Sequence, residues 1–535
     1  MLYDYIIAGA GSAGCVLAER LSREPGNRVL LVEAGGADRH PYLRIPKGVG
    51  KLFGDPTFSW HYRTRPVREG GNPEVWVRGK VLGGSSSVNG MVYNRGSRAD
   101  WDELEGLGNP GWGWDSVLPA FRAIENNALG PSLTRGAAGP LRVSTVRDPD
   151  PLCDELIATG RAFGLRDIPD VNEEDGERIG YTMATIAAGQ RFSAARAFLR
   201  PARSRPNLTV ARETTVTRVL FDGDKAVGVR VRKTGGQEED VRARREVILS
   251  LGSLATPRLL QLSGIGPAEV LRSAGVDVRL DRPTVGARLR EHRCLALRFR
   301  LNAQLGVNRF LATPAAQART GAAYLLTRRG PLARPAYDVM AFLKSRPERE
   351  RPDTEVLLAP WSLAALQPGK PASVEREPGI SACAMALRPT SEGALAITSA
   401  DPDAGLDIDP GYFSSEHDRQ VTADLFGRLR DFFAVDPIAS RIRHETFPGP
   451  DVSSDSQDDI VRSALDGGYC GFHAIGTCAM GSGADDVTDT QLRVRGVDNL
   501  RVVDASVLPV MVSGNLNGPV MAMAWRAAEF IRDEA

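Results

Sequence analysis

The apolar positions at the start of the chain follow the order strand, glycine turn, helix, strand. Residues 5–8 form a short apolar run that predicts a buried strand, and residues 28–32 form a second such run. Between them, Val16, Leu17 and Leu21 recur at helical spacing, which predicts a helix with one apolar face. This order is that of a complete βαβ unit.

Later segments combine alternating strands with a final helix. Residues 209–220 and 226–233 alternate with period two on either side of a DGDKA turn, which predicts two paired strands. Residues 246–251 predict a short buried strand. Residues 520–535 predict a helix that opens at Pro519, because proline is favoured in the first turn.

A glycine motif occupies the turn between the first strand and the first helix. Gly9, Gly11 and Gly14 have the GxGxxG spacing, which permits a tight turn, close approach of a pyrophosphate and close packing of helix on strand. Glu33 ends the second strand, where its carboxylate can accept a hydrogen bond from a ribose 2′-hydroxyl. The motif predicts dinucleotide binding, but it does not distinguish NAD from FAD.

The composition of the chain limits which partners and which cellular compartment can be expected. The chain has 535 residues, enough for about two to four domains, and its net charge of +1 gives no reason to expect nucleic acid or a membrane surface as a partner. The 6 cysteines show no CxxC pair and are expected to be reduced thiols, and the histidines lack metal-ligand spacing, so no metal is expected. The chain enters an apolar strand at once and has no run of 18 apolar residues. We therefore expect a cytoplasmic protein with a small-molecule partner.

A second glycine-rich segment indicates which dinucleotide is bound. Residues 78–96, RGKVLGGSSSVNGMVYNRG, form a turn whose backbone N–H groups and hydroxyls would be open to a ligand. The segment resembles the glucose-methanol-choline (GMC) family of FAD-dependent oxidoreductases, in its bacterial alcohol oxidase and choline dehydrogenase-like branch. The resemblance covers nearly the whole chain and includes VILSLGSLATPRLLQLSGIGP at 247–267, GFHAIGTCAMG at 471–481 and the C-terminal block that starts at residue 492.

The resemblance implies an α/β fold with a Rossmann-type FAD-binding domain and an α+β substrate domain built around an antiparallel sheet. The FAD-binding domain would be discontinuous and comprise residues 1–160, 201–291 and 467–535, and the substrate domain would comprise residues 161–200 and 292–466. Residues 300–380 match no block of the family, so we expect this segment to shape the substrate site.

The resemblance also implies the contacts with FAD. Carried over position by position, they are Gly9, Gly11, Ser12, Ala13 and Gly14 at the pyrophosphate turn, Glu33 and Ala34 at the ribose, Trp60, Gly84, Asn89, Gly90, Met91 and Val92 toward the flavin, Val216 near the adenine, and Asp504, Ala505, Gly518 and Pro519 from the C-terminal blocks. Members that bind FAD covalently carry a histidine where this chain has Val88, so we expect a non-covalent flavin.

The reacting groups come from two of the C-terminal blocks. His473, in CGFHAIGTCAMG, matches the family's active-site histidine, and Asn517, in SGNLNGP, matches its second catalytic position. Phe472 would shape the substrate pocket beside the histidine. The block around Glu291 departs from the family pattern, and we expect a structural role between the domains for its His292.

These groups predict the oxidation of an alcohol CH–OH group to an aldehyde or ketone. A neutral imidazole at His473 can accept the hydroxyl proton while the carbinol hydrogen leaves as hydride to flavin N5. Asn517 would hydrogen-bond the substrate oxygen, and oxygen or another acceptor would take the electrons from the flavin. A redox-silent lyase that cleaves cyanohydrins stays open as an alternative, because relatives with this fold have that activity. The sequence identifies neither the alcohol, the acceptor nor the oligomeric state.

Overall fold

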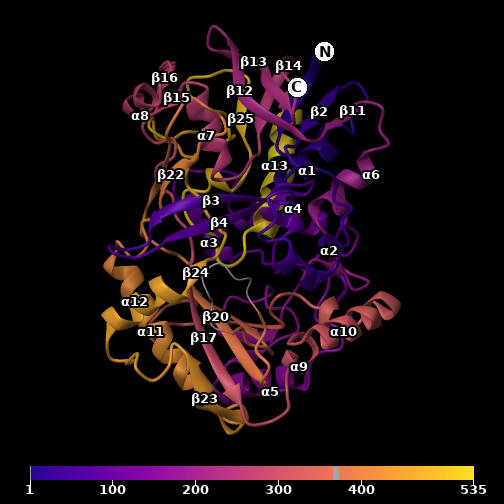
Figure 1. Ribbon diagram of the computed structural model, residues 1–535. Coiled ribbons are helices and arrows are strands. Elements are labelled where there is room, and N and C mark those ends of the chain that lie inside the picture. The colour runs from indigo at the N-terminus through magenta and orange to yellow at the C-terminus, as the bar shows by residue number, and fades with distance from the viewer. Residues whose placement is uncertain (1, 365–372, 535) are drawn as a thin grey trace.

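The computed structural model describes residues 2–364 and 373–534. Residues 365–372, which belong to the segment expected to shape the substrate site, lie outside the described residues. The chain is built around two large β-sheets, and in the view of Figure 1 one lies above the other with helices beside each.

Seven strands form the first sheet, and five of them are parallel. The parallel strands are β11 (Leu208–Ala211), β2 (Val29–Val32), β1 (Leu2–Ala8), β14 (Glu238–Leu249) and β25 (Leu500–Val502). The antiparallel strands β12 (Thr214–Asp222) and β13 (Lys225–Lys233) extend the sheet from the first part of β14. All four residues of β2 are buried, as expected for a parallel strand covered on both faces.

Three helices pack together beside this sheet. Helix α1 (Ser12–Leu21) packs against β1, β2 and α13 (Asn517–Asp533), and α4 (Trp114–Ile124) packs against α13. Val16, Leu17 and Leu21 of α1 are fully buried, which confirms the apolar helix face. The order β1, α1, β2 confirms the βαβ unit.

Two strand predictions were wrong in their bounds. The strand expected over 209–220 is divided into β11 and β12, because Glu213 adopts a positive φ of 53° and its N–H donates to the carbonyl of Gly35. Strand β14 starts at Glu238 and not at residue 246, because its first part is a polar strand that pairs with β13. Apolar periodicity detected only its buried end.

Eight strands form the second sheet. Its antiparallel strands are, in order, β23 (Ile442–Phe447), β17 (Arg293–Leu301), β20 (Gly379–Ala386), β19 (Thr354–Ala359), β18 (Val339–Leu343) and β8 (Arg178–Tyr181), while the short β7 (Arg166–Asp167) and β24 (Tyr469–Cys470) pair with β8 and β17. Apolar residues of this sheet and of α5 (Pro151–Ala162), α11 (Glu416–Phe433) and α12 (Gln457–Gly467) share one core. The predicted antiparallel sheet is thus confirmed.

Several segments meet where the two sheets approach each other. The hairpin of β3 (Ser59–Pro66) and β4 (Pro73–Gly79) lies between the sheets in Figure 1 and leads into the 3₁₀ turn η2 (Gly84–Ser87). The start of β17 pairs with β24, so the residues just before β17 lie beside those just after β24. This junction brings together residues that are distant in the sequence.

Candidate active site

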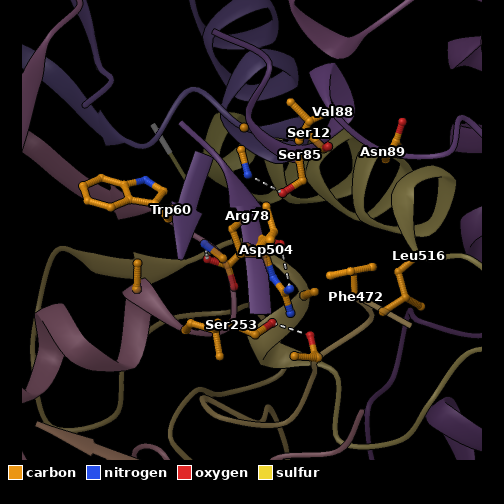
Figure 2. Close-up of a pocket in the computed structure, with 18 of the residues that line it drawn as sticks. Ser12, Trp60, Arg78, Ser85, Val88, Asn89, Ser253, Phe472, Asp504 and Leu516 are labelled. Atoms are coloured by element: carbon orange, nitrogen blue, oxygen red, sulfur yellow. Dashed lines mark hydrogen bonds between the residues drawn. The ribbon is translucent and has the colours of Figure 1, made fainter. Parts of the chain in front are cut away.

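A cavity of about 610 Å³ extends from the first sheet to the second. Gly9 and Glu33 line one end of it, at the carboxyl ends of β1 and β2, where open parallel sheets bind their ligands. Tyr337, next to β18, and Tyr469 line the other end. Figure 2 shows Trp60, Arg78, Val88, Phe472 and Asp504 among the side chains around this space.

Three glycines at the first end, Gly9, Gly14 and Gly84, leave no room for a side chain. Gly9 has a φ of 98°, and a Cβ there would lie 2.5 Å from the carbonyl oxygen of Ser250. A Cβ on Gly14 would lie 1.9 Å from the carbonyl oxygen of Gly9, and one on Gly84 would lie 2.7 Å from the Cα of Gly11. Backbone therefore packs on backbone, and the N-terminus of α1 opens into the cavity, an arrangement that suits a pyrophosphate.

Glu33 both supports this turn and lines the cavity. Its Oε2 accepts a hydrogen bond from the N–H of Ala10 at 2.9 Å, and its Oε1 accepts one from the N–H of Gly35 at 2.8 Å. Burial raises the pKa of this carboxyl group to about 7. Because Glu33 lines the cavity, the predicted contact with a ribose hydroxyl is sterically open.

Most residues predicted to contact FAD lie on the cavity wall. They are Gly9, Gly11, Ser12, Ala13, Glu33, Ala34, Trp60, Asn89, Gly90, Met91, Val92, Val216, Asp504 and Ala505. Gly14, Gly84, Gly518 and Pro519 do not line it. Three of these four shape the cavity indirectly: Gly14 and Gly84 allow the contacts just described, and a Cβ on Gly518 would lie 2.3 Å from the carbonyl oxygen of Asn94.

His473 follows β24 and is held through both ring nitrogens. Its Nε2 lies 3.0 Å from Nδ2 of Asn515, and its Nδ1 lies 2.9 Å from Nδ1 of His292. The side chain lines the cavity in a residue that is only 8% exposed. Burial, followed by the charges of His292 and Arg78, lowers its pKa well below the usual value. The imidazole is therefore neutral at neutral pH and can accept a proton.

The asparagine beside His473 is Asn515, and the expectation that Asn517 would occupy this place was wrong. Oδ1 of Asn517 accepts a hydrogen bond from the hydroxyl of Ser12 at 2.8 Å, so this side chain lies at the N-terminus of α1. Asn515 precedes α13 and Asn517 is its first residue, and the turn between them directs the two amides to different partners. The stretch SGNLNGP contains both asparagines, and only the fold distinguishes them.

A buried network lies behind Asn515. Nδ2 of Asn94 donates to Oδ1 of Asn515 at 3.2 Å and to Oε1 of Glu355 at 3.1 Å. Asn94 and Glu355 are almost completely buried, and burial raises the pKa of Glu355 to about 7. The sequence analysis identified neither residue, because Asn94 and Glu355 are 261 positions apart.

Glu291 fixes the backbone of both histidines. Its Oε1 accepts hydrogen bonds from the N–H of His473 at 2.6 Å and the N–H of His292 at 3.0 Å, while its Oε2 lies 3.3 Å from Nη2 of Arg78. Burial raises the pKa of Glu291 to about 7. His292 was expected to have a structural role between the domains. Its ring lies against the proposed active-site histidine, which by the expected boundaries belongs to the other domain.

The far end of the cavity is mostly apolar. The hydroxyls of Tyr337 and Tyr469 lie 2.5 Å apart, and the side chains that line the cavity also include those of Phe53, Cys294, Leu357, Leu363, Cys383, Met385 and Phe472. Phe472 is 39% exposed and lines the cavity beside His473, at the place predicted for it. Among the described residues on the wall, the acidic ones are Glu33, Asp403 and Asp504, and all three lie toward the first sheet.

Two further findings concern other kinds of site. Within residues 2–364 and 373–534, no group of three or more His, Cys, Asp or Glu side chains is placed to hold a metal ion. Over the same residues, no helix has the length and the apolar character needed to cross a membrane.

Relatives with curated descriptions match almost the whole chain. The alcohol dehydrogenase [acceptor] of Pseudomonas putida is 37% identical, with 99% of this chain and 96% of the relative covered. The mitochondrial choline dehydrogenase of Homo sapiens is 38% identical, with 99% and 90% covered. Both relatives are named as dehydrogenases, and neither is named as a lyase.

Solved structures have the same fold. The pyridoxine 4-oxidase of Mesorbium loti superposes with a TM-score of 0.87 at 30% identity, covering 99% of each chain. A formate oxidase superposes with a TM-score of 0.91 at 27% identity, covering 100% of this chain and 98% of the other. Family models described as GMC oxidoreductase match residues 3–294 and 389–524. The chain therefore belongs to the GMC oxidoreductase family, and it is an FAD-dependent enzyme that oxidises the CH–OH group of an alcohol.

Proposed function

We propose that this enzyme oxidises an uncharged, largely apolar alcohol, with His473 as the base and Asn515 as the group that positions the substrate oxygen. The observation that supports this most directly is the pairing of His473 Nε2 with Asn515 Nδ2 at 3.0 Å on the cavity wall. In this arrangement a proton acceptor and a hydrogen-bond donor lie side by side, as the hydroxyl group of an alcohol requires.

The two side chains divide the work at the hydroxyl group. When the alcohol binds, its O–H takes the place of the Asn515 amide at Nε2 of His473, which accepts the proton, and the amide N–H of Asn515 then donates to the alcohol oxygen. The bound FAD supplies the two-electron acceptor for the carbinol hydrogen. Phe472 and the apolar wall exclude water from this proton transfer.

Cofactor binding is assigned to the residues at the first end of the cavity. The N-terminus of α1 at Ser12 would hold the pyrophosphate, Glu33 the ribose, and the segment Asn89–Val92 the flavin. Val88 lines the cavity, and its side chain has no atom able to bond covalently to a flavin, so we expect unfolding to release FAD. The discontinuous FAD-binding domain and the substrate domain keep the boundaries inferred from the resemblance.

The charge around the far end favours a neutral substrate over choline. The acidic residues on the cavity wall lie toward the first sheet, while Arg78 lies 5.8 Å from the ring of Phe472, beside the reacting end. A quaternary ammonium group there would have aromatic rings nearby but no carboxylate on the wall to balance its charge. An aliphatic or aromatic alcohol fits this wall without that cost.

Two finer points complete the proposal. Oxygen or another acceptor takes the electrons from the reduced flavin. A cytoplasmic location is supported by the cysteines, because all 6 are buried free thiols, as in proteins of a reducing compartment.

The test is anaerobic reduction of the bound flavin by benzylic, furanic, aliphatic and sugar alcohols, followed by air with detection of peroxide. We expect a benzylic or aliphatic alcohol to bleach the flavin absorbance faster than the sugar alcohols do. Rapid recovery in air with peroxide would assign oxygen as the acceptor, and slow recovery would assign another one. If sugar alcohols reduced the flavin fastest, the apolar substrate class would be wrong.

A further inference from the structure

We infer that His292 is a positioning residue that fixes the tautomer of His473 and thereby leaves Nε2 of His473 as the base. The inference rests on the proposed function, because it concerns the same reaction. It follows from a chain of hydrogen bonds in which the donor at each step is set by the step before.

The chain starts at a group that can only accept. Nε2 of His292 lies 2.9 Å from the carbonyl oxygen of Leu387, and a carbonyl has no proton to give. Nε2 of His292 must therefore carry a hydrogen. The residue is fully buried, and this burial lowers its pKa to about 4, so the ring is neutral at neutral pH and its Nδ1 has no hydrogen.

The next step fixes the ring of His473. Its Nδ1 lies 2.9 Å from the bare Nδ1 of His292, so Nδ1 of His473 must be the donor. A neutral imidazole with a hydrogen on Nδ1 has none on Nε2. The nitrogen that faces Asn515 is thus the unprotonated one, and the amide N–H of Asn515 donates to it at 3.0 Å.

The other end of the network agrees with this direction. If Asn515 donates through Nδ2, its Oδ1 is free to accept, and Nδ2 of Asn94 lies 3.2 Å from it. The second hydrogen of that Asn94 amide points to Oε1 of Glu355 at 3.1 Å. The hydrogen bonds therefore run in one direction from Asn94 to Leu387, while Asn94 also donates to Glu355, so that no two donors and no two acceptors face each other.

The backbone around the two rings is built to allow their contact. The N–H of Gly471 donates to the carbonyl of His292 at 2.8 Å, and Glu291 accepts from the N–H groups of His292 and His473. A Cβ on Gly471 would lie 2.8 Å from Cβ of His292 and 2.9 Å from Nδ1 of His473. Any side chain at this position would force the two imidazoles apart.

The first test is the tautomer itself, measured by ¹⁵N NMR on the oxidised holoprotein labelled in histidine. We expect Nδ1 of His473 to be protonated and Nε2 to be unprotonated in the wild type, and His292→Leu to lose this preference. A protonated Nε2 in the wild type would overturn the inference. Because no substrate is present, this result does not depend on whether alcohols reduce the flavin.

The second test is the rate of flavin reduction by the best alcohol. His292→Leu should lower this rate by roughly 100-fold at unchanged FAD content, as for other groups that orient a reacting side chain. His292→Asn should recover most of the rate, because its Oδ1 can replace the lone pair of Nδ1. The exposed His417 provides the matched control, and His417→Leu should keep the wild-type rate.

A variant that keeps both histidines guards against a folding artefact. Gly471→Ala should lower the reduction rate and disturb the tautomer of His473, although both rings are present. If His292→Leu or Gly471→Ala bound FAD fully and reduced it within about twofold of the wild type, the positioning role would be wrong. If no alcohol reduced even the wild-type flavin, the proposed function would fail and the NMR test would still decide the tautomer.

Discussion

The two ends of the cavity are specified in different ways. At the nucleotide end, the glycine turn, α1 and Glu33 come from one continuous stretch, residues 9–33, whose contacts are set by close backbone packing. At the reacting end, His473 meets His292 and Asn515, which are 181 and 42 positions away. The core of the nucleotide end is thus encoded in one local stretch, although Ser250 and Gly84 pack against it, whereas the reacting end exists only once the two sheets have come together.

The largest effect is expected from breaking the local end. Gly14→Ala should abolish FAD binding, because a Cβ at this position would lie 1.9 Å from the carbonyl oxygen of Gly9. The nearest atom belongs to the backbone of the turn itself, so no flexible side chain can move away to relieve the clash. The ratio of flavin absorbance to protein absorbance after purification measures the loss.

The matched control for this variant is Gly26→Ala, since nothing lies within 4 Å of a Cβ at Gly26. That variant should retain a full complement of FAD. A Gly14→Ala protein with equally full FAD would show that the turn is not the rigid element described above.

The next largest effect is expected from removing the base at the other end. His473→Ala should keep FAD bound and lose about 10²–10⁴ in the rate of anaerobic flavin reduction. Stopped-flow absorbance with the best alcohol measures this rate. The exposed His444 supplies a control, because His444→Ala removes an imidazole that does not line the cavity. A His473→Ala rate close to that of the wild type would reject the assigned base.

A smaller effect should distinguish the two neighbouring asparagines. Asn515→Ala should slow flavin reduction by about 10- to 100-fold, as for the loss of a hydrogen bond worth about 1.5–3 kcal/mol when charge develops on the oxygen. Asn517→Ala should instead weaken FAD binding, because it removes the partner of Ser12. Reduction rates and FAD dissociation constants of both variants test this difference. The opposite ranking would return the second catalytic position to Asn517.

The smallest effect concerns the buried carboxyl groups. Burial raises the pKa of Glu33, Glu291 and Glu355 to about 7, above the usual value for glutamate. The folded state therefore holds these protons after the unfolded state has released them, and stability should fall as pH rises from about 4.5 to 7. Glu355→Gln should make the thermal unfolding midpoint less dependent on pH in this window. An unchanged slope would show that Glu355 does not contribute.

The features that could be predicted from the sequence lie mostly at the nucleotide end, and those that could not lie mostly at the reacting end. The βαβ unit, the antiparallel sheet and the wall position of residues such as Glu33 and Trp60 were predictable, because they depend on short patterns or on blocks shared with the family. The partner of His473 was not, because SGNLNGP offers two asparagines and their directions depend on where α13 begins. Asn94, Glu355 and the contact of His292 depend on the packing of separate strands, for which the chain contains no local signal.

The central claim is that a neutral alcohol reacts at His473 and Asn515, and a pair of alcohols of equal shape tests it most directly. 3,3-Dimethylbutan-1-ol has the shape of choline but carries an uncharged carbon atom in place of the charged nitrogen. Their rates of anaerobic flavin reduction in the wild-type holoprotein should be compared at equal concentration. The account predicts that the neutral alcohol bleaches the flavin and that choline does so far more slowly. Faster reduction by choline would contradict it.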